Sequence, residues 1–261
     1  MSASEHDAVV RSSFEKQTGL FTGDDALFGR RFARRSSSAL AWLEPLDPDM
    51  IVLDVACGAA HAAEQAAPHV RQVVGLDLTR ALLDFGAQRL REAGITNVLL
   101  QEGSAAELPF LDASFDLVFC RAALHHMPDP GGAVAEMARV CKPGGRVVAA
   151  DMVAPSADVR KAFDALHRAL DPSHAGVLLE SELAELLEAK VGTLAYGETS
   201  DPFRIPLEHI LTDAADRDAV TSALDAELAG GAETGFDPVL EDDQTLVAFT
   251  NTVVHARRRP G

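Results

Sequence analysis

A buried strand that runs directly into a turn of small residues is the feature that most constrains this chain. Residues 52–61 read VLDVACGAAH, an apolar strand followed by alanine, cysteine and glycine and then by the start of a helix. A second apolar strand, residues 73–76, ends at Asp77. Small residues let a ligand approach the backbone closely, and the first turn of a helix offers unpaired N–H groups. A carboxylate at the tip of the next strand can accept both hydroxyls of a ribose, so the pattern predicts a nucleoside site.

The turn lacks the glycines that a dinucleotide needs. In the pattern G-x-G-x-x-G a pyrophosphate lies against bare backbone, whereas here Ala56, Gly58 and Ala60 stand at the matching positions. The chain also has no G-K-[ST] that would form a phosphate-binding loop. A nucleoside without phosphates tolerates alanines better, because no dianion has to lie against the turn. The sequence therefore favours a nucleoside cofactor without a pyrophosphate.

Predicted strands and helices alternate along residues 46–152. We predict strands at 52–55, 73–76, 98–100, within 114–126 and at 146–152, separated by helices at 60–70, 79–94 and 132–140. This alternation predicts an α/β fold with a doubly wound, mostly parallel sheet. Ligands bind such sheets at the carboxyl ends of the strands. The singled-out residues Gly58, Asp77, Ser104, Arg121 and His125 all fall at that edge.

Four ordered segments carry a family resemblance: the turn at 52–61, QEGSAAELPF at 101–110, SFDLVFCRAALHH at 114–126 and RVCKPGGRVV at 139–148. They resemble the class I S-adenosylmethionine (SAM) methyltransferases, most closely the branch with ubiquinone/menaquinone-biosynthesis and small-molecule methyltransferases. The resemblance implies SAM as cofactor and a Rossmann-like, mostly parallel seven-stranded sheet. In that fold the last two strands, which we expect at 193–196 and 245–256, pair as an antiparallel hairpin.

The resemblance also implies which residues hold the cofactor. Asp77 would accept the ribose hydroxyls, and Asp54 would orient the methionine end or cap the turn through its carboxylate. Arg121 would reach the cofactor carboxylate or contribute only its backbone carbonyl. Ser104 stands near the adenine amino group, where the branch often has an acid. The complete predicted set is Asp54, Ala56, Gly58, Asp77, Leu78, Gly103, Ser104, Ala105 and Arg121.

Three histidines are the candidates for catalysis. The methyl of SAM is already electrophilic, so a general base is needed only when the acceptor must lose a proton. His125 and His126 follow the expected fourth strand, and imidazole titrates near neutral pH. His174 is a third candidate, and the alternative for each is a packing or loop-fixing side chain. His61 opens a helix, where the dipole disfavours an imidazolium, so we expect it to be neutral and non-catalytic.

Two segments outside the sheet are expected to form the acceptor pocket. Residues 1–45 are predicted to be an N-terminal helical cap, and residues 46–261 the SAM-binding domain with an insertion at about 199–243. A connection this long usually has a function of its own, so we expect it to form a lid with the N-terminal helices. Phenylalanines of the N-terminal segment, if they line the pocket, would favour a flat, apolar or aromatic acceptor.

Charge and composition argue against several classes of protein. Forty acidic residues against 23 basic ones give a net charge of −17, whereas nucleic-acid binding normally needs a basic surface. The three cysteines, Cys57, Cys120 and Cys141, form no C-x-x-C pair, so neither a disulfide framework nor a metal site is predicted. No apolar run approaches the ~20 residues of a membrane span. No secretion signal is visible, which favours the cytoplasm, and the sequence leaves a homodimer open.

These observations predict a SAM-dependent methyltransferase that modifies oxygen, carbon or nitrogen of a small, apolar or aromatic metabolite. Two alternatives stay open at this point. One is a protein that binds SAM without methyl transfer, for instance in a rearrangement. The other is a non-catalytic member that acts as a binding or assembly partner.

Overall fold

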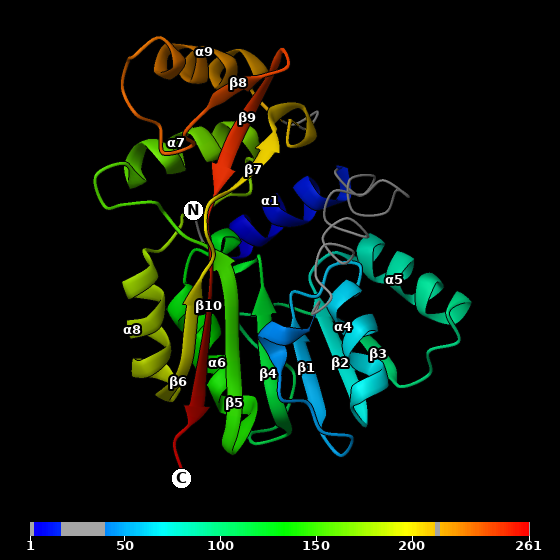
Figure 1. The fold of residues 1–261 in the computed structure, drawn as a ribbon. Helices are drawn as coiled ribbons and strands as arrows, with labels where there is room; N and C mark the ends of the chain where they lie inside the picture. The colour runs from blue at the N-terminus through cyan, green and yellow to red at the C-terminus, as the bar shows by residue number, and fades with distance from the viewer. Residues whose placement is uncertain (1–2, 17–39, 212–214, 261) are drawn as a thin grey trace.

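A seven-stranded mixed sheet forms the centre of the molecule. The computed structural model describes residues 3–16, 40–211 and 215–260. The strand order is β3-β2-β1-β4-β5-β10-β6, and only β10 runs antiparallel to its neighbours (Figure 1). The bounds of these strands are β1 (Ile51–Val55), β2 (Gln72–Asp77), β3 (Val98–Glu102), β4 (Phe115–Arg121), β5 (Cys141–Met152), β6 (Gly192–Thr199) and β10 (Asn251–Arg258). The predicted doubly wound α/β fold is confirmed.

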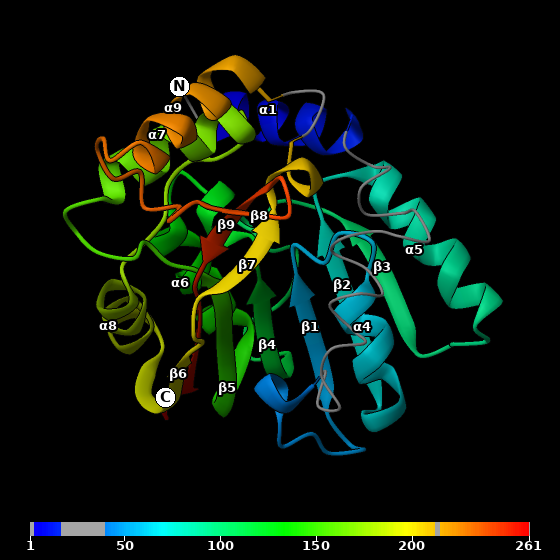
Figure 2. The ribbon, with the colours of Figure 1, turned by 45° about the horizontal axis from the view of Figure 1, so that its top comes forward.

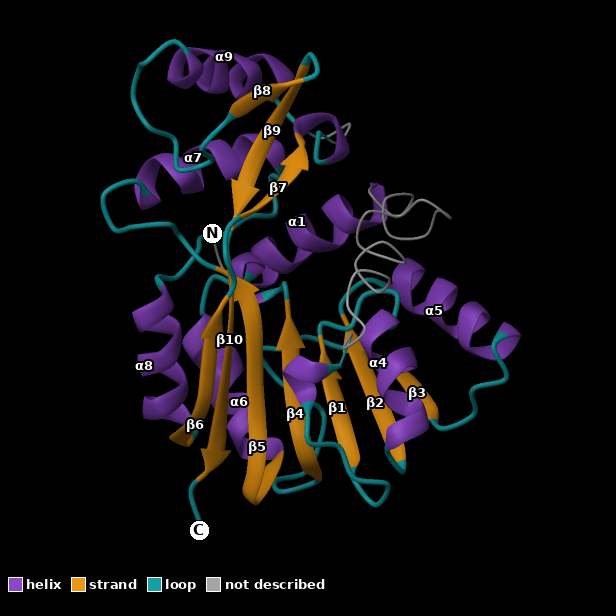
Figure 3. Cartoon of the chain, viewed as in Figure 1, coloured by secondary structure: helices purple, strands orange, loops and turns teal. Residues whose placement is uncertain are grey.

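Helices cover both faces of this sheet (Figure 3). Their bounds are α4 (His61–Ala66), α5 (Arg80–Glu92), α6 (Pro130–Val140) and α8 (Glu180–Lys190). Successive strand residues point to opposite faces, so one strand feeds two cores. Val52 packs with alanines of α4 and with Leu90 of α5, whereas Leu53 packs with residues of α6 and α8.

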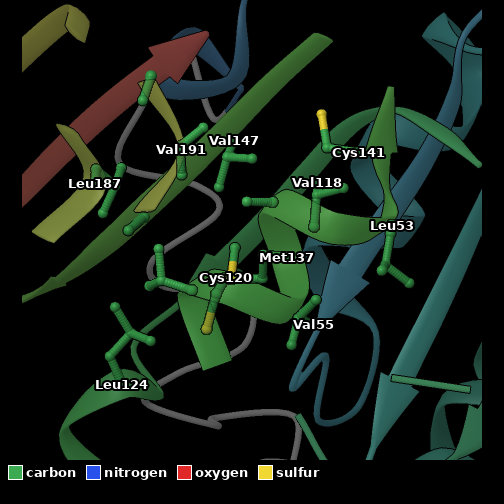
Figure 4. Packing of buried hydrophobic residues seen from close by; sticks show 14 of the residues in the cluster. Leu53, Val55, Val118, Cys120, Leu124, Met137, Cys141, Val147, Leu187 and Val191 are labelled. Carbon is green, nitrogen blue, oxygen red and sulfur yellow. The ribbon is translucent and has the colours of Figure 1, made fainter. Parts of the chain in front are cut away.

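The core on the α6 and α8 side is almost wholly aliphatic. Figure 4 shows Leu53 and Val55 of β1, Val118 of β4, Val147 of β5 and Met137 of α6 gathered in this cluster. These side chains are completely buried. Burying an aliphatic side chain stabilises the fold by about 1.5–3 kcal/mol, so this packing fixes the strands whose carboxyl ends form the site.

A second, smaller sheet lies beyond the carboxyl ends of the central strands (Figures 1 and 2). It consists of β7 (Phe203–Pro206), β9 (Gln244–Phe249) and β8 (Val239–Glu241), all antiparallel. Together with α7 (Arg160–Leu170) and α9 (Arg217–Leu228) it encloses a third core that includes Phe163 and Phe236. Helix α1 (Ala3–Lys16) crosses the same edge of the central sheet (Figure 2).

The prediction of one strand over residues 245–256 is wrong. The chain changes sheets at Thr250: β9 belongs to the small sheet, and β10 continues into the central sheet. The small sheet therefore extends beyond residue 243, where we expected the insertion to end. The pairing of β6 with β10 is antiparallel, as predicted for the last two strands.

The predicted N-terminal helical cap falls only partly within the described residues. Helix α1 accounts for its first part, residues 17–39 lie outside the described ranges, and a short 3-10 helix (Ala41–Leu43) lies in its last part. Within those ranges no helix has the length and apolar character that a membrane crossing requires.

Candidate active site

A cavity of about 730 Å³ lies along the carboxyl ends of the central strands. All nine residues predicted for the cofactor line it, together with side chains from α1, α7 and the small sheet. Of the three histidines proposed for catalysis, His125 and His126 line the cavity and His174 does not. His61, expected to be non-catalytic, also borders the cavity, with its Nε2 3.4 Å from Arg89 Nη1.

The turn after β1 has a left-handed backbone at three positions. Ala56, Gly58 and Ala60 have φ angles of 57°, 53° and 59°. This conformation costs an L-residue roughly 1–2 kcal/mol, so surrounding packing must hold the two alanines in it. Ala60 is completely buried against α5. A Cβ built on Gly86 of that helix would approach the Ala60 Cβ to 3.3 Å and the Ala59 carbonyl oxygen to 2.9 Å, so the glycine leaves room for the alanine turn.

The carboxylate of Asp77 is fixed by the backbone on both sides. Its Oδ2 accepts the N–H of Gly58 at 2.7 Å, and its Oδ1 accepts the N–H of Thr79 at 2.8 Å. Burial raises the pKa of this carboxyl, and hydrogen bonds from the backbone of Thr79, Gly58 and Leu78 and from the Thr79 side chain oppose that effect. The carboxylate lines the cavity, where a carboxylate is a hydrogen-bond acceptor for ligand hydroxyls.

Asp54 and Arg121 both line the cavity and interact electrostatically. The Oδ2 atom of Asp54 is buried and has no hydrogen-bond partner among the described residues. Burial raises the pKa of this carboxyl to about 8, and the positive charge of Arg121 opposes that rise. The Arg121 guanidinium lies 5.8 Å from the ring centroid of Trp42, and burial lowers its pKa.

The buried carboxylate of Asp151, which was not predicted from the sequence, contacts His125. The His125 Nδ1 lies 2.5 Å from Asp151 Oδ1, while Asp151 Oδ2 accepts the N–H groups of Ala123 and Leu124 at 3.1 and 2.6 Å. Burial raises the pKa of Asp151, but the charge and hydrogen bond of His125 outweigh it and the net shift is downward. Asp151 lies near the carboxyl end of β5, as Asp77 lies at the carboxyl end of β2, and this position is the signal that could have revealed it.

His126 faces the same cavity but has different chemistry. Its Nδ1 is 3.0 Å from Ser173 Oγ, and that hydroxyl donates to Asp171 at 2.6 Å. Burial and the neighbouring His125 lower the pKa of His126 to about 3. An imidazole with so low a pKa takes up a proton poorly, which argues against His126 as a base.

His174 lies behind the cavity wall. Its Nε2 is 2.8 Å from Asp164 Oδ1, and its ring stacks on that of His167 with the centroids 4.2 Å apart. Burial lowers the pKa of His174 to about 4. His167 lines the cavity in its place, and its Nδ1 has no partner within the described part of the chain. His167 was not predicted from the sequence. The signal that could have indicated it is its spacing of four residues from Phe163, on the inward face of α7.

The part of the cavity beyond His125 has mainly apolar walls. Its side chains come from α1, α7, the small sheet and the segments beside it: Val10, Phe14, Leu170, Phe203, Ile205, Ile210 and Phe249. The polar side chains among them are few, and include His167, His209, Asp171 and Asn251. A pocket of this kind fits an apolar ligand that carries a small number of polar groups.

Comparison with known proteins identifies the family of this chain. The family model described as methyltransferase domain matches residues 53–149. The demethylmenaquinone methyltransferase of Anoxybacillus flavithermus is 34% identical over 158 residues, which cover 58% of this chain and 67% of that protein. The chain belongs to the class I SAM-dependent methyltransferases.

Other relatives of this methyltransferase agree with the assignment. The uncharacterized methyltransferase YcgJ of Bacillus subtilis is 42% identical over 135 residues, covering 51% of this chain and 52% of YcgJ. The chain thus spans about half the length of some curated relatives that it matches. The crystal structure of YcgJ superposes with a TM-score of 0.73 and 28% identity, covering 84% of this chain and 96% of that structure.

The residues of the cavity fit SAM, the cofactor of this family. The unpartnered buried oxygen of Asp54 suits an ammonium group, and the neighbouring guanidinium of Arg121 suits a carboxylate. These are the two charges of an amino-acid end. Among the described residues no group of three or more histidine, cysteine or acidic side chains is placed to hold a metal ion.

Proposed function

We propose that this methyltransferase moves the methyl group of SAM to a small, flat, apolar acceptor that carries a hydroxyl group, and that His125 removes the proton of that hydroxyl. The observation that carries the proposal is the buried pair of His125 and Asp151, whose atoms Nδ1 and Oδ1 are 2.5 Å apart at the cavity wall. The apolar walls beyond His125 support an apolar acceptor.

Asp151 determines what His125 can do. An ionised carboxylate at Nδ1 holds the proton there, which leaves Nε2 free to accept one from the acceptor. After the transfer, the same carboxylate stabilises the imidazolium. Four backbone N–H groups donate to Asp151 and keep this carboxylate in place, those of Ala123, Leu124, His125 and Met152.

Cofactor binding follows from the other side chains of the cavity. Asp77 accepts the ribose hydroxyls, Asp54 accepts the ammonium group, and Arg121 binds the carboxylate. The backbone around Ala56 and Gly58 admits the cofactor because the side chains there are small. When bound, SAM supplies a methyl group on a sulfonium, which needs no further activation by the protein.

The acceptor atom is oxygen or a carbon conjugated with it. Loss of a proton from a phenol or enol spreads negative charge over oxygen and the adjacent ring carbons, so either atom can attack the methyl. The name of the Anoxybacillus flavithermus relative, demethylmenaquinone methyltransferase, is compatible with such an acceptor. An acceptor nitrogen would need a base only where it carries an excess proton.

Isotope transfer tests this proposal directly. SAM with a labelled methyl group, incubated with the protein and a panel of apolar phenols, enols and amines, should label a hydroxylated acceptor on oxygen or an adjacent carbon. The variant His125→Ala should lose about a hundredfold or more in turnover while keeping its affinity for S-adenosylhomocysteine. Full turnover in that variant, or label found only on amines, would contradict the proposed base. No transfer to any acceptor would favour a cofactor-binding protein without methyl transfer.

A further inference from the structure

We propose that Asp7 of helix α1 accepts a hydrogen bond from the amino group of the cofactor's adenine. The inference rests on the proposed cofactor site and adds a residue from outside the family's sequence motifs. It makes the N-terminal helix a part of the nucleoside site as well as a wall of the acceptor pocket.

The strand order determines where the adenine lies. Asp77 is the last residue of β2, and Asp54 and Arg121 belong to β1 and β4, on one side of β2. A ribose at Asp77 with an amino-acid end at β1 and β4 requires the base to extend in the opposite direction. The neighbour of β2 on that side is β3, whose following residues 103–106 line the cavity.

An acidic side chain from α1 lines the cavity beside this loop, in addition to Asp77. Asp7 lines the cavity there, and its Oδ2 accepts the hydroxyl of Ser104 at 3.2 Å. Among the described residues no hydrogen bond to its Oδ1 is found, which leaves this atom as an acceptor for a ligand. An exocyclic amino group is a donor, so a carboxylate at this position favours adenine over a base that presents a carbonyl oxygen there. The serine at position 104 also avoids a second negative charge beside Asp7.

Polar contacts on both sides hold α1 over the cavity. Arg11 Nε donates to the carbonyl of Leu78 after β2 at 3.2 Å. His6 Nε2 lies 2.7 Å from the carbonyl oxygen of His126 after β4. Ser13 Oγ donates to Asp171 Oδ1 at 3.1 Å. These contacts span the loops that flank the nucleoside, so the position of Asp7 is set by the loops themselves.

The test compares two nucleosides that differ at one group. Isothermal titration calorimetry would measure the affinity for S-adenosylhomocysteine and for S-inosylhomocysteine, in which a carbonyl oxygen replaces the amino group. The wild type should prefer the first. Asp7→Ala should lower the affinity for S-adenosylhomocysteine by about tenfold to a hundredfold, since a hydrogen bond to a charged group is lost. It should also remove most of the preference for this nucleoside. Glu15→Ala, which removes an exposed acid from the same helix, should change neither affinity.

A double variant separates recognition from helix displacement. Asp7→Ala combined with Ser104→Asp returns one carboxylate to the same place and should restore the preference for adenine. The inference would be overturned if Asp7→Ala lowered the affinity for both nucleosides equally, or left the preference for S-adenosylhomocysteine unchanged. Either result would leave the proposed cofactor site intact. A wild type that binds neither nucleoside would overturn the proposed function and this inference with it.

Discussion

The two ends of the cavity are built in different ways. The cofactor end consists of loops that follow four adjacent parallel strands, β1 to β4, all within residues 51–126. The acceptor end combines α1, α7, β7 and β9, whose residues are far apart in the chain. The first is therefore set by short motifs, and the second only by the complete fold. His125 and Asp151 stand where the two ends meet.

The pair at this boundary gives the largest expected effect. Asp151→Asn should lower kcat by about a hundredfold to ten-thousandfold, because His125 loses the carboxylate that holds its tautomer and stabilises its charge. Affinity for S-adenosylhomocysteine should stay within about twofold, because the cofactor end is unchanged. Steady-state kinetics and calorimetry together check both statements.

A second histidine–aspartate pair provides the matched control. His174 and Asp164 form the same kind of contact, with 2.8 Å between Nε2 and Oδ1, but His174 does not line the cavity. Asp164→Asn should therefore leave kcat close to that of the wild type. If both asparagine variants lose turnover equally, the assignment of the base to His125 is wrong.

The next effect belongs to the cofactor end alone. Asp77→Ala should lower the affinity for S-adenosylhomocysteine by about tenfold to a hundredfold, since the two ribose hydroxyls lose an ionised acceptor. The KM for the acceptor should not change. Asp84→Ala, which removes an exposed acid paired with Arg80, is the control. Equal affinity in the Asp77 variant and the control would refute the ribose assignment.

The pH dependence of binding gives the smallest effect. Burial raises the pKa of Asp54 to about 8, from an ordinary value of 3.8. The folded protein therefore holds a proton that the unfolded chain releases, and this group's contribution to the free energy of unfolding is lost as pH rises from about 4 to about 8. An ammonium group needs the ionised carboxylate, so affinity should rise with pH by at most about tenfold per unit and level off near pH 8.

Calorimetry between roughly pH 6 and 8.5 would measure this rise in affinity. The variant Asp54→Asn tests whether Asp54 is the group that titrates. Because asparagine does not titrate, the variant should bind S-adenosylhomocysteine weakly with little change over this range. Its melting temperature at pH 8 should exceed that of the wild type, since no buried charge remains at that position. A pH slope equal to that of the wild type would assign the proton to another group.

The cofactor end of the cavity could be predicted from the sequence far better than the acceptor end. The turn at Ala56 and Gly58 and the acid at Asp77 are local signals, and the fold and family that they indicated are confirmed. Their roles in binding stay predictions. The structure brings all nine predicted cofactor residues to one cavity because parallel strands end at the same edge.

The acceptor end was harder to predict because its signals are not local. Residues 246–249 and 253–254 are apolar runs separated by three polar residues without glycine or proline, so no turn signal marks the change of sheet between β9 and β10. His167 has the helical spacing of a core residue, and only the approach of α7 to the sheet edge brings it to the cavity. His174, the third candidate for catalysis, stacks on His167 and does not line the cavity.

A crystal structure with bound S-adenosylhomocysteine tests the central claim most directly. The account predicts the ribose hydroxyls on the Asp77 carboxylate, the amino-acid end beside Asp54 and Arg121, and the sulfur facing the His125 side of the cavity. Density for the nucleoside at any other place, or a crevice at Asp77 filled by protein side chains, would contradict it.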